Sequence, residues 1–249
     1  MKLALIVPFK NLDLMNISDY DYILTREAKM NKQYKDFYTK SERYSILDNN
    51  VHERSEINWE DHVELAINMG VNEIVVPDVM KDKERTLRYF NEFMNMFYEK
   101  LKEHNIIIQA VPQGETWEEI QECFDVFNKD TRVKIIGNSF DLIPFQICDK
   151  KYENQSFNRT LIINSWIRKS NKPIHLLGSN GTGELITLSK FSLIRSTDGK
   201  LFSRIGLANM DLEKEMDVYK PNIKMYFDDD IENKNLFIRN VNYFKQIIN

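Results

Sequence analysis

The sequence predicts an α/β fold, a TIM-like (β/α)8 barrel formed by a single domain, and three observations support it. Eight short apolar runs rich in β-branched residues recur along the 249-residue chain. Their hydrophobicity is continuous rather than alternating, which is typical of strands buried on both faces of a parallel sheet. Amphipathic stretches separate most of the runs, as helical crossovers between parallel strands require. A doubly wound open sheet is the alternative.

The eight apolar runs define the predicted strands in chain order. They cover residues 3–8, 20–25, 44–49, 73–78, 106–113, 133–138, 173–178 and 191–198. The connections between the first three runs are irregular and show no clear helical pattern. We therefore expect an unusual beginning to the barrel.

Capping residues mark the predicted helices. The stretch 58–70 opens on Asn58, a favourable N-cap, and closes on Gly70, a favourable C-terminal residue. The stretch 116–128 places Glu119 three residues after Thr116, the spacing of a capping box. Further helices are expected over residues 83–105, 158–171 and 182–189, and a last one from about residue 235 to 248.

The composition favours one large domain. Hydrophobic residues make up 42% of the chain, glycine and proline number only 8 and 6, and no Ser/Gly/Pro-rich linker interrupts the sequence. We expect the barrel to span residues 1–204. Residues 205–249 are then a C-terminal extension packed on the barrel.

Charge and cysteine content exclude several classes of protein. The formal net charge of −4 gives no overall basic field, which argues against a protein that coats or packages nucleic acid. An enzyme with a local basic groove remains compatible with it. The two cysteines are too few for a disulfide framework or a cysteine-rich zinc site. The sequence has no signal peptide and no apolar run of about 18 residues, so we expect a cytoplasmic protein.

Polar residues follow six of the predicted strands. In a barrel of this type the functional site lies at the carboxyl ends of the strands, so these residues are expected to meet at one rim. The segments are Asp48-Asn49-Asn50, Pro77-Asp78, Gln113-Gly114, Gly137-Asn138, His175 to Gly178, and Arg195 to Asp198.

The same segments resemble the tRNA-guanine transglycosylase family. The chain has "DNNVHE" (48–53) where that family has Asp-Ser-Gly-Gly-Phe-Gln, and "VVPDV" supplies the Asp that ends the next strand. The segments "VPQGE" (111–115), "IIGNS" (135–139), "HLLG" (175–178) and "LIRSTDG" (193–199) are similar to the family's later motifs, in the same order. The resemblance covers residues 44 to 199.

Two departures from the family pattern narrow the resemblance. The chain has no CxC or CxxC, so the family's zinc site is missing, and Asn49 and Asn50 replace the two glycines. A shorter, zinc-less form is closer to the DNA-modifying branch, the DpdA-like enzymes that place 7-deazaguanine bases such as preQ0 in DNA. DNA is therefore favoured over tRNA as the polynucleotide.

The resemblance implies a role for each rim residue. Asp198 would be the nucleophile that captures the sugar, and Asp48 the acid and base that exchanges a proton with the leaving and incoming purine. Other residues would bind the base: Asp78, Gln113, Gly114, Gly137, Asn138, Leu177, Gly178, Asn49, Glu53 and His175. Arg195, Lys200 and Arg204 are the candidates for phosphate contacts. No cofactor and no metal are implied; a homo-oligomer or a partner subunit is compatible with the sequence.

Each of these residues also has a purely structural interpretation. Asp48 is compatible with a loop cap and Asp78 with a helix cap after Pro77. His175 lies in an apolar run, as core histidines do, and Asp198 lies in a Thr-Asp-Gly turn sequence. Two other functions use the same residues. Water in place of the incoming base would make the protein an N-glycosidase of nucleosides or nucleotides. A transglycosylase-like subunit that binds nucleic acid without catalysis is the third possibility.

Overall fold

The computed structural model describes residues 1–49, 58–142 and 155–249, and it gives the predicted sequence of strands and helices. All eight predicted strands are present. They are β1 (Lys2–Leu3), β2 (Asp21–Leu24), β3 (Ser45–Asp48), β4 (Glu73–Val75), β5 (Ile107–Ala110), β6 (Val133–Ser139), β7 (Ile174–Leu177) and β8 (Ile194–Thr197).

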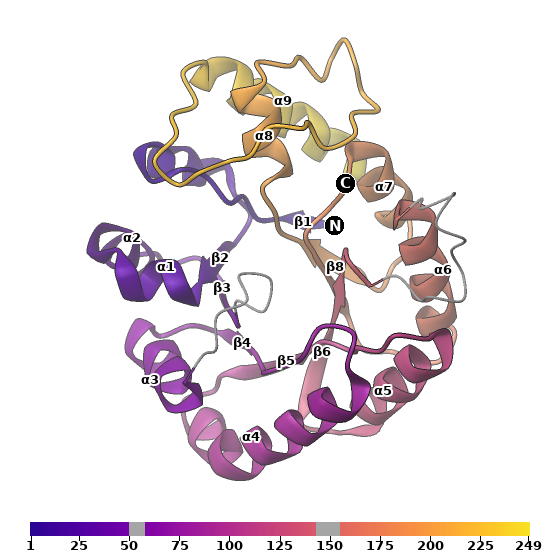
Figure 1. Cartoon of the computed structure of the whole chain (residues 1–249). Coiled ribbons are helices and arrows are strands. Elements are labelled where there is room, and N and C mark those ends of the chain that lie inside the picture. The colour runs from indigo at the N-terminus through magenta and orange to yellow at the C-terminus, as the bar shows by residue number, and fades with distance from the viewer. Residues whose placement is uncertain (50–57, 143–154) are drawn as a thin grey trace.

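The strands form one parallel sheet in the order β1-β8-β7-β6-β5-β4-β3-β2. This is the strand order of a (β/α)8 barrel, and the sheet is strongly curled (Figure 1). Among the described strands, β1 and β2 form no ladder with each other, so the barrel is open between them. Side chains bridge part of this seam: Leu3 N donates to Asp19 Oδ2 at 2.7 Å, and Leu5 N donates to Ser18 Oγ at 3.1 Å.

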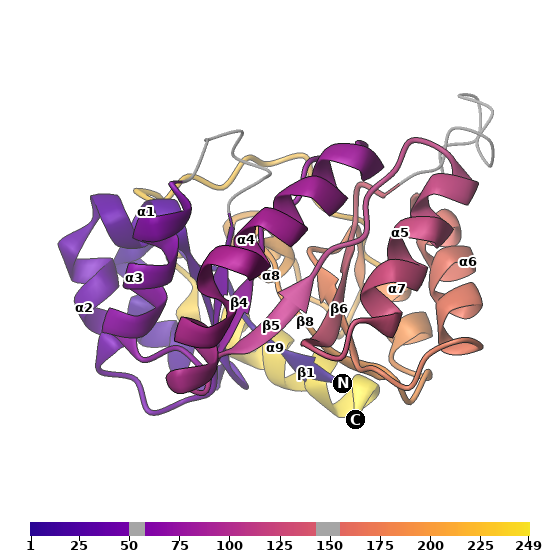
Figure 2. The same cartoon turned by 90° about the horizontal axis from the view of Figure 1, so that it is seen from below.

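The irregular beginning expected from the sequence is confirmed. A 3-10 helix, η1 (Phe9–Ile17), takes the place of the first crossover helix, and two short helices follow β2. The α-helices, including these two, lie outside the curled sheet (Figures 1 and 2). They are α1 (Thr25–Met30), α2 (Lys32–Thr39), α3 (Trp59–Met69), α4 (Lys83–Glu103), α5 (Trp117–Lys129), α6 (Gln155–Ile167), α7 (Thr182–Leu188), α8 (Leu201–Leu207) and α9 (Lys234–Ile248).

The predicted caps are formed. The Asn58 side chain accepts a hydrogen bond from Asp61 N at the start of α3, and Gly70 ends that helix with a φ of 64°. At the start of α5, Thr116 and Glu119 form both hydrogen bonds of the capping box. These helix ends are therefore specified locally, by side chains within one turn of the boundary.

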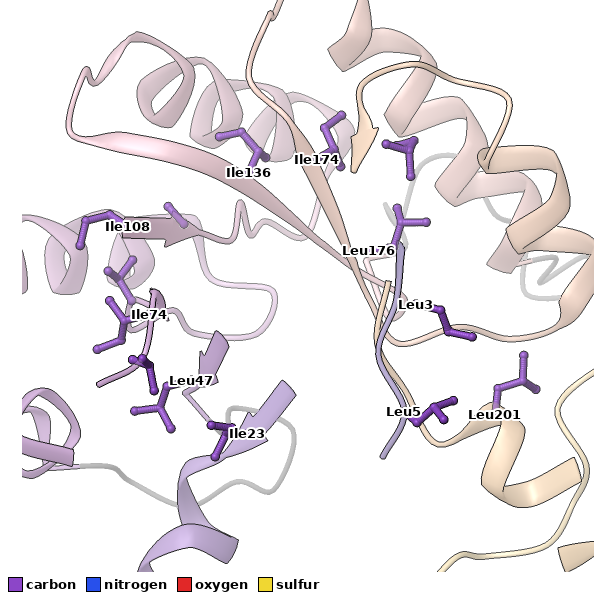
Figure 3. Close-up of a cluster of buried hydrophobic side chains, with 14 of the residues drawn as sticks. Leu3, Leu5, Ile23, Leu47, Ile74, Ile108, Ile136, Ile174, Leu176 and Leu201 are labelled. Carbon is purple, nitrogen blue, oxygen red and sulfur yellow. The ribbon is translucent and has the colours of Figure 1, made fainter. Parts of the chain in front are cut away.

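Two layers of buried side chains lie on the two faces of the sheet. The larger lies between the sheet and the helices and includes Leu47, Ile74, Ile108 and Ile136 (Figure 3). A smaller cluster, including Ala4, Ile6, Tyr22 and Val75, lies on the opposite face. Burial on both faces accounts for the continuous hydrophobicity of the strands.

The C-terminal extension packs on the barrel. Helix α9 contacts α8, η1 and α7, and the N-terminal amino group donates to Ile248 O at 3.4 Å. Both termini consequently lie together, at the lower edge of Figure 2. Helix α8 spans residue 204, where the sequence suggested that the barrel ends. No helix of the described ranges combines the length and the apolar character needed to cross a membrane.

Candidate active site

A cavity of about 220 Å³ opens at the carboxyl ends of the strands. Nine of the side chains or glycines that the sequence predicted for the site line it. They are Asp48, Asn49, Asp78, Gln113, Leu177, Gly178, Asp198, Lys200 and Arg204. These residues end or follow β3, β4, β5, β7 and β8, or lie at α8, so the curled sheet is what brings these distant segments together.

Asp198 follows β8 and is fixed through one of its two carboxylate oxygens. The Oδ1 atom accepts a hydrogen bond from Gly178 N at 3.2 Å and lies 3.2 Å from His175 Nε2. Among the described residues, no donor reaches the Oδ2 atom. The side chain is 6% exposed and lines the cavity. One oxygen is therefore held in place and the other remains available to a ligand.

Gly178 can make this contact because it lies in the left-handed region, with a φ of 68°. A side chain at this position would be strained, and its Cβ would lie only 2.7 Å from a ring carbon of Phe140. The glycine places its N–H toward Asp198 without obstructing the cavity.

His175 holds the Asp198 side chain in place through its Nε2 atom. It is fully buried, and its Nδ1 atom lies 2.9 Å from Ser196 Oγ and 3.5 Å from the Tyr20 hydroxyl. The Tyr22 ring stacks on the imidazole, with 5.5 Å between the ring centres. His175 does not line the cavity. It positions the Asp198 carboxylate, which does line it.

Asp48 ends β3 and also faces the cavity. Its Oδ1 atom accepts a hydrogen bond from the Tyr22 hydroxyl at 2.7 Å. Burial raises the pKa of Tyr22 well above its ordinary value, and the nearby carboxylates of Asp48 and Asp198 raise it further. Tyr22 consequently stays protonated and acts as a hydrogen-bond donor. Its hydroxyl contacts Asp48, and its ring stacks on His175, which contacts Asp198.

Asp78 is held by two side-chain amides. Asn49 Nδ2 donates to Oδ1 at 2.6 Å, and Gln113 Nε2 donates to Oδ2 at 2.5 Å. Burial raises the pKa of Asp78 to about 6, although both amides oppose this shift by stabilising the carboxylate. The carboxylate is therefore ionised at neutral pH and its plane is fixed by the two amides.

A buried arginine connects the ends of β6 and β7. Arg159 donates to the carbonyl oxygens of Asn138 and Gly178 at 2.6 and 2.7 Å, and its Nη1 atom lies 3.5 Å from Glu184 Oε1. It also donates to the Asn138 side chain at 2.7 Å. Asn138, predicted to bind the base, is instead part of this support and does not line the cavity.

Three cationic side chains lie along one wall of the cavity: Lys200, Arg204 and Lys220. The Lys200 and Lys220 ammonium groups lie over the rings of Phe227 and Phe140, at 4.9 and 4.8 Å from the ring centres. Burial lowers the pKa of Lys220 to about 8, and the positive charges of Arg204 and Lys200 contribute to this decrease.

Other predicted site residues lie away from the cavity. Arg195 was expected to contact phosphate, but its guanidinium forms two contacts with the buried Glu73 carboxylate, at 2.7 and 3.1 Å. Gly114 packs against the first turn of α5, where a Cβ atom would lie 2.7 Å from Glu119 Cβ. Gly137 packs against Val111 and Gln109. Glu53 lies outside the described residues.

The sequence did not identify three residues of this arrangement. Tyr22 lies in a predicted strand, and this position gave no sign of its contact with Asp48. Arg159 has a signal that was not used, since it is an isolated charge at the start of an apolar helical stretch. Lys220 has none, because it lies in an irregular segment.

The cavity brings together three carboxylates, of Asp48, Asp78 and Asp198, and three cationic side chains. Groups of these kinds can transfer protons, attack as nucleophiles, accept hydrogen bonds or bind an anion. Within the described ranges, no group of three His, Cys, Asp or Glu side chains is placed to hold a metal ion. The sequence matches no model of a known protein family, and it has no significant match among curated proteins.

Proposed function

We propose that this chain is a base-exchange glycosyltransferase that replaces guanine in a polynucleotide with a 7-deazaguanine base. DNA is favoured over tRNA on the resemblance described above. The observation that supports the proposal most strongly is the state of Asp198: one carboxylate oxygen is anchored by Gly178 and His175, and the other has no donor among the described residues. A retaining glycosyl transfer needs such a nucleophile.

In the proposed reaction, Asp198 Oδ2 attacks C1′ of the target nucleoside. The bond between C1′ and the purine nitrogen breaks, its electron pair stays on the purine, and protonated Asp48 supplies the proton that the leaving guanine takes up. The incoming base then returns a proton to Asp48 and displaces Asp198 from C1′. Tyr22 holds the Asp48 side chain in place through its 2.7 Å hydrogen bond.

Asp78 accounts for the choice of base. Guanine and 7-deazaguanine present two donors on one edge, N1–H and the 2-amino group, and an ionised carboxylate accepts from both. Adenine presents an acceptor at N1 and is disfavoured. Since Asn49 and Gln113 fix the plane of the Asp78 carboxylate, the direction of its remaining lone pairs is fixed as well.

The decisive experiment is incorporation of labelled guanine and of a labelled 7-deazaguanine into DNA and into tRNA. We expect label in the polynucleotide with the wild-type protein, and none with Asp198→Asn. Asp125→Asn is the matched control, since Asp125 lies on α5 and is absent from the cavity wall. Mass spectrometry of the protein after reaction with substrate alone should find the sugar attached to the peptide that contains Asp198.

Each other outcome leads to a different conclusion. Release of guanine without incorporation would make the protein an N-glycosidase. Full exchange by Asp198→Asn would refute the assigned nucleophile. No reaction by folded protein on either polymer would overturn the proposal and favour a non-catalytic subunit.

A further inference from the structure

The C-terminal extension contributes a side chain to the cavity wall. The segment around Val218 is anchored to the beginning of α7: Thr182 N donates to Val218 O at 3.0 Å, and Val218 N donates to Thr182 Oγ1 at 2.8 Å. Lys220 N donates to Asn180 O at 2.7 Å. These backbone contacts fix the chain on both sides of Tyr219 and direct Lys220 to the cavity.

Among the residues that the structure describes, the three cations of the wall have no ion-pair partner. Elsewhere in the molecule buried or half-buried arginines are paired, as Arg159 is with Glu184 and Arg195 with Glu73. Within the described part of the chain, Lys200, Arg204 and Lys220 form no ion pair and their side chains make no hydrogen bond. The Nε atom of Arg204 is buried without a partner.

An anion bound among these three cations would be stabilised by their positive charge. Burial is the main cause of the decreased pKa of Lys220, and repulsion by the neighbouring positive charges adds to it. The charged groups that face Lys220 are Arg204 and Lys200, which lower its pKa, and Asp141 and Asp198, which raise it.

We infer that Lys200, Arg204 and Lys220 form a subsite for one phosphate diester of the polynucleotide, next to the nucleotide whose sugar meets Asp198. A phosphate carries the charge that the cluster lacks and has oxygens for several donors at once. The location beside the target nucleotide rests on the proposed function. Anion binding by the cluster itself does not.

The test uses a probe on which the proposed enzyme can do no chemistry. A short oligothymidylate contains no guanine, so its binding reports contacts that do not depend on the proposed base exchange, including those to phosphate. We expect Lys220→Met to weaken its binding about tenfold and to reduce the salt dependence of log K by about 0.7, the value for one lost phosphate contact on a single strand. Lys224→Met, an exposed lysine of the same segment that does not line the cavity, is the matched control and should bind as the wild type does.

The pH dependence separates this subsite from a general basic surface. Binding by the wild type should weaken as the pH rises through about 8, where Lys220 loses its proton. Lys220→Arg should retain binding and lose this transition, because arginine stays charged. Inorganic phosphate should compete with the oligothymidylate, and thymidine should not.

Equal loss in Lys220→Met and Lys224→Met, or no loss in Lys220→Met, would overturn the inference, as would a wild type that does not bind the probe. A chain that binds oligothymidylate as expected but exchanges no guanine would retain the subsite and refute the proposed function. If the chain exchanges guanine but Lys220→Met binds oligothymidylate as tightly as the wild type, the proposed function would be retained and the subsite refuted.

Discussion

The ionisation of Asp78 offers the sharpest test of the site, through replacement of Gln113 by Met. The Gln113 amide donates one of the two side-chain hydrogen bonds that stabilise the Asp78 carboxylate. A hydrogen bond to a charged group is worth about 1.5–3 kcal/mol, and one pKa unit corresponds to about 1.4 kcal/mol. Removing this donor should therefore raise the pKa of Asp78 by about one to two units, from about 6 to about 7–8.

This change has a measurable effect at neutral pH. With a pKa of about 6, roughly nine in ten Asp78 side chains are ionised at pH 7. In Gln113→Met the ionised fraction should fall to between roughly one in ten and one in two. Carboxyl-carbon NMR should report the pKa directly, and guanine binding followed by calorimetry should fall with the ionised fraction. Gln121→Met, a buried glutamine on α5 without contact to Asp78, is the control.

The sign of the pH dependence follows from the direction of the shift. The pKa of Asp78 in the folded protein, about 6, exceeds its ordinary value of 3.8, so the folded state binds the proton more tightly. The stabilisation by this group is complete below about pH 4 and is lost as the pH rises through about 6. Guanine binding should change in the opposite direction and increase over the same interval. A wild-type Asp78 that titrates near 4, or an unchanged midpoint in Gln113→Met, would refute the reasoning.

Three further substitutions test other parts of the structure. Tyr22→Phe removes the hydroxyl that donates to Asp48 but keeps the ring, so kcat for base exchange should fall roughly tenfold or more while the circular dichroism spectrum is unchanged. Arg159→Met leaves the buried Glu184 without its cation and should lower the free energy of unfolding by about 3–5 kcal/mol in urea; a loss below about 1 kcal/mol would contradict the pairing. Trp166→Ala empties a fully buried site behind the sheet and should cost about 3–5 kcal/mol by the same measurement.

The sequence was sufficient for the elements and their order because their signals are local. Continuous apolar runs identify strands buried on both faces, and Asn58, Gly70 and the Thr116–Glu119 pair mark helix ends within a single turn. The open seam was not predictable in this way. It depends on how residues 3–5 meet residues 18–19 after the chain has closed around the barrel, and side-chain bridges there replace a strand ladder.

The candidate site was predicted in part for the same reason. Residues at the end of a strand or shortly after it, such as Asp48, Asp78 and Asp198, reach the cavity because strand ends meet at one rim. Lys220 was not predicted because it lies in an irregular segment that is positioned by contacts distant in sequence, among them those with residues 180–182. Asn138 and His175 follow or lie in strands as well, but they support the wall from behind it. Position along a strand does not reveal which of these roles a side chain takes.

Arg195 shows most clearly where such reasoning fails, and its role can be tested against the one predicted for it. The carboxylate of Glu73 is fully buried and accepts hydrogen bonds from Tyr44 and from both ends of the Arg195 guanidinium. Arg195→Met would leave that carboxylate without a cation, at a cost of about 3–5 kcal/mol in the free energy of unfolding.

The double variant Glu73→Gln/Arg195→Met removes both charges and should recover much of the lost stability, because replacing a buried pair by uncharged groups costs less than breaking it. Arg168→Met, which removes an exposed arginine after α6, should change stability little. If Arg195 acted on phosphate instead, Arg195→Met would leave the unfolding curve unchanged and weaken oligonucleotide binding. We expect Arg195→Met to lower the stability and to leave oligonucleotide binding unchanged, because the guanidinium already binds a buried carboxylate and has few donors left for a second anion.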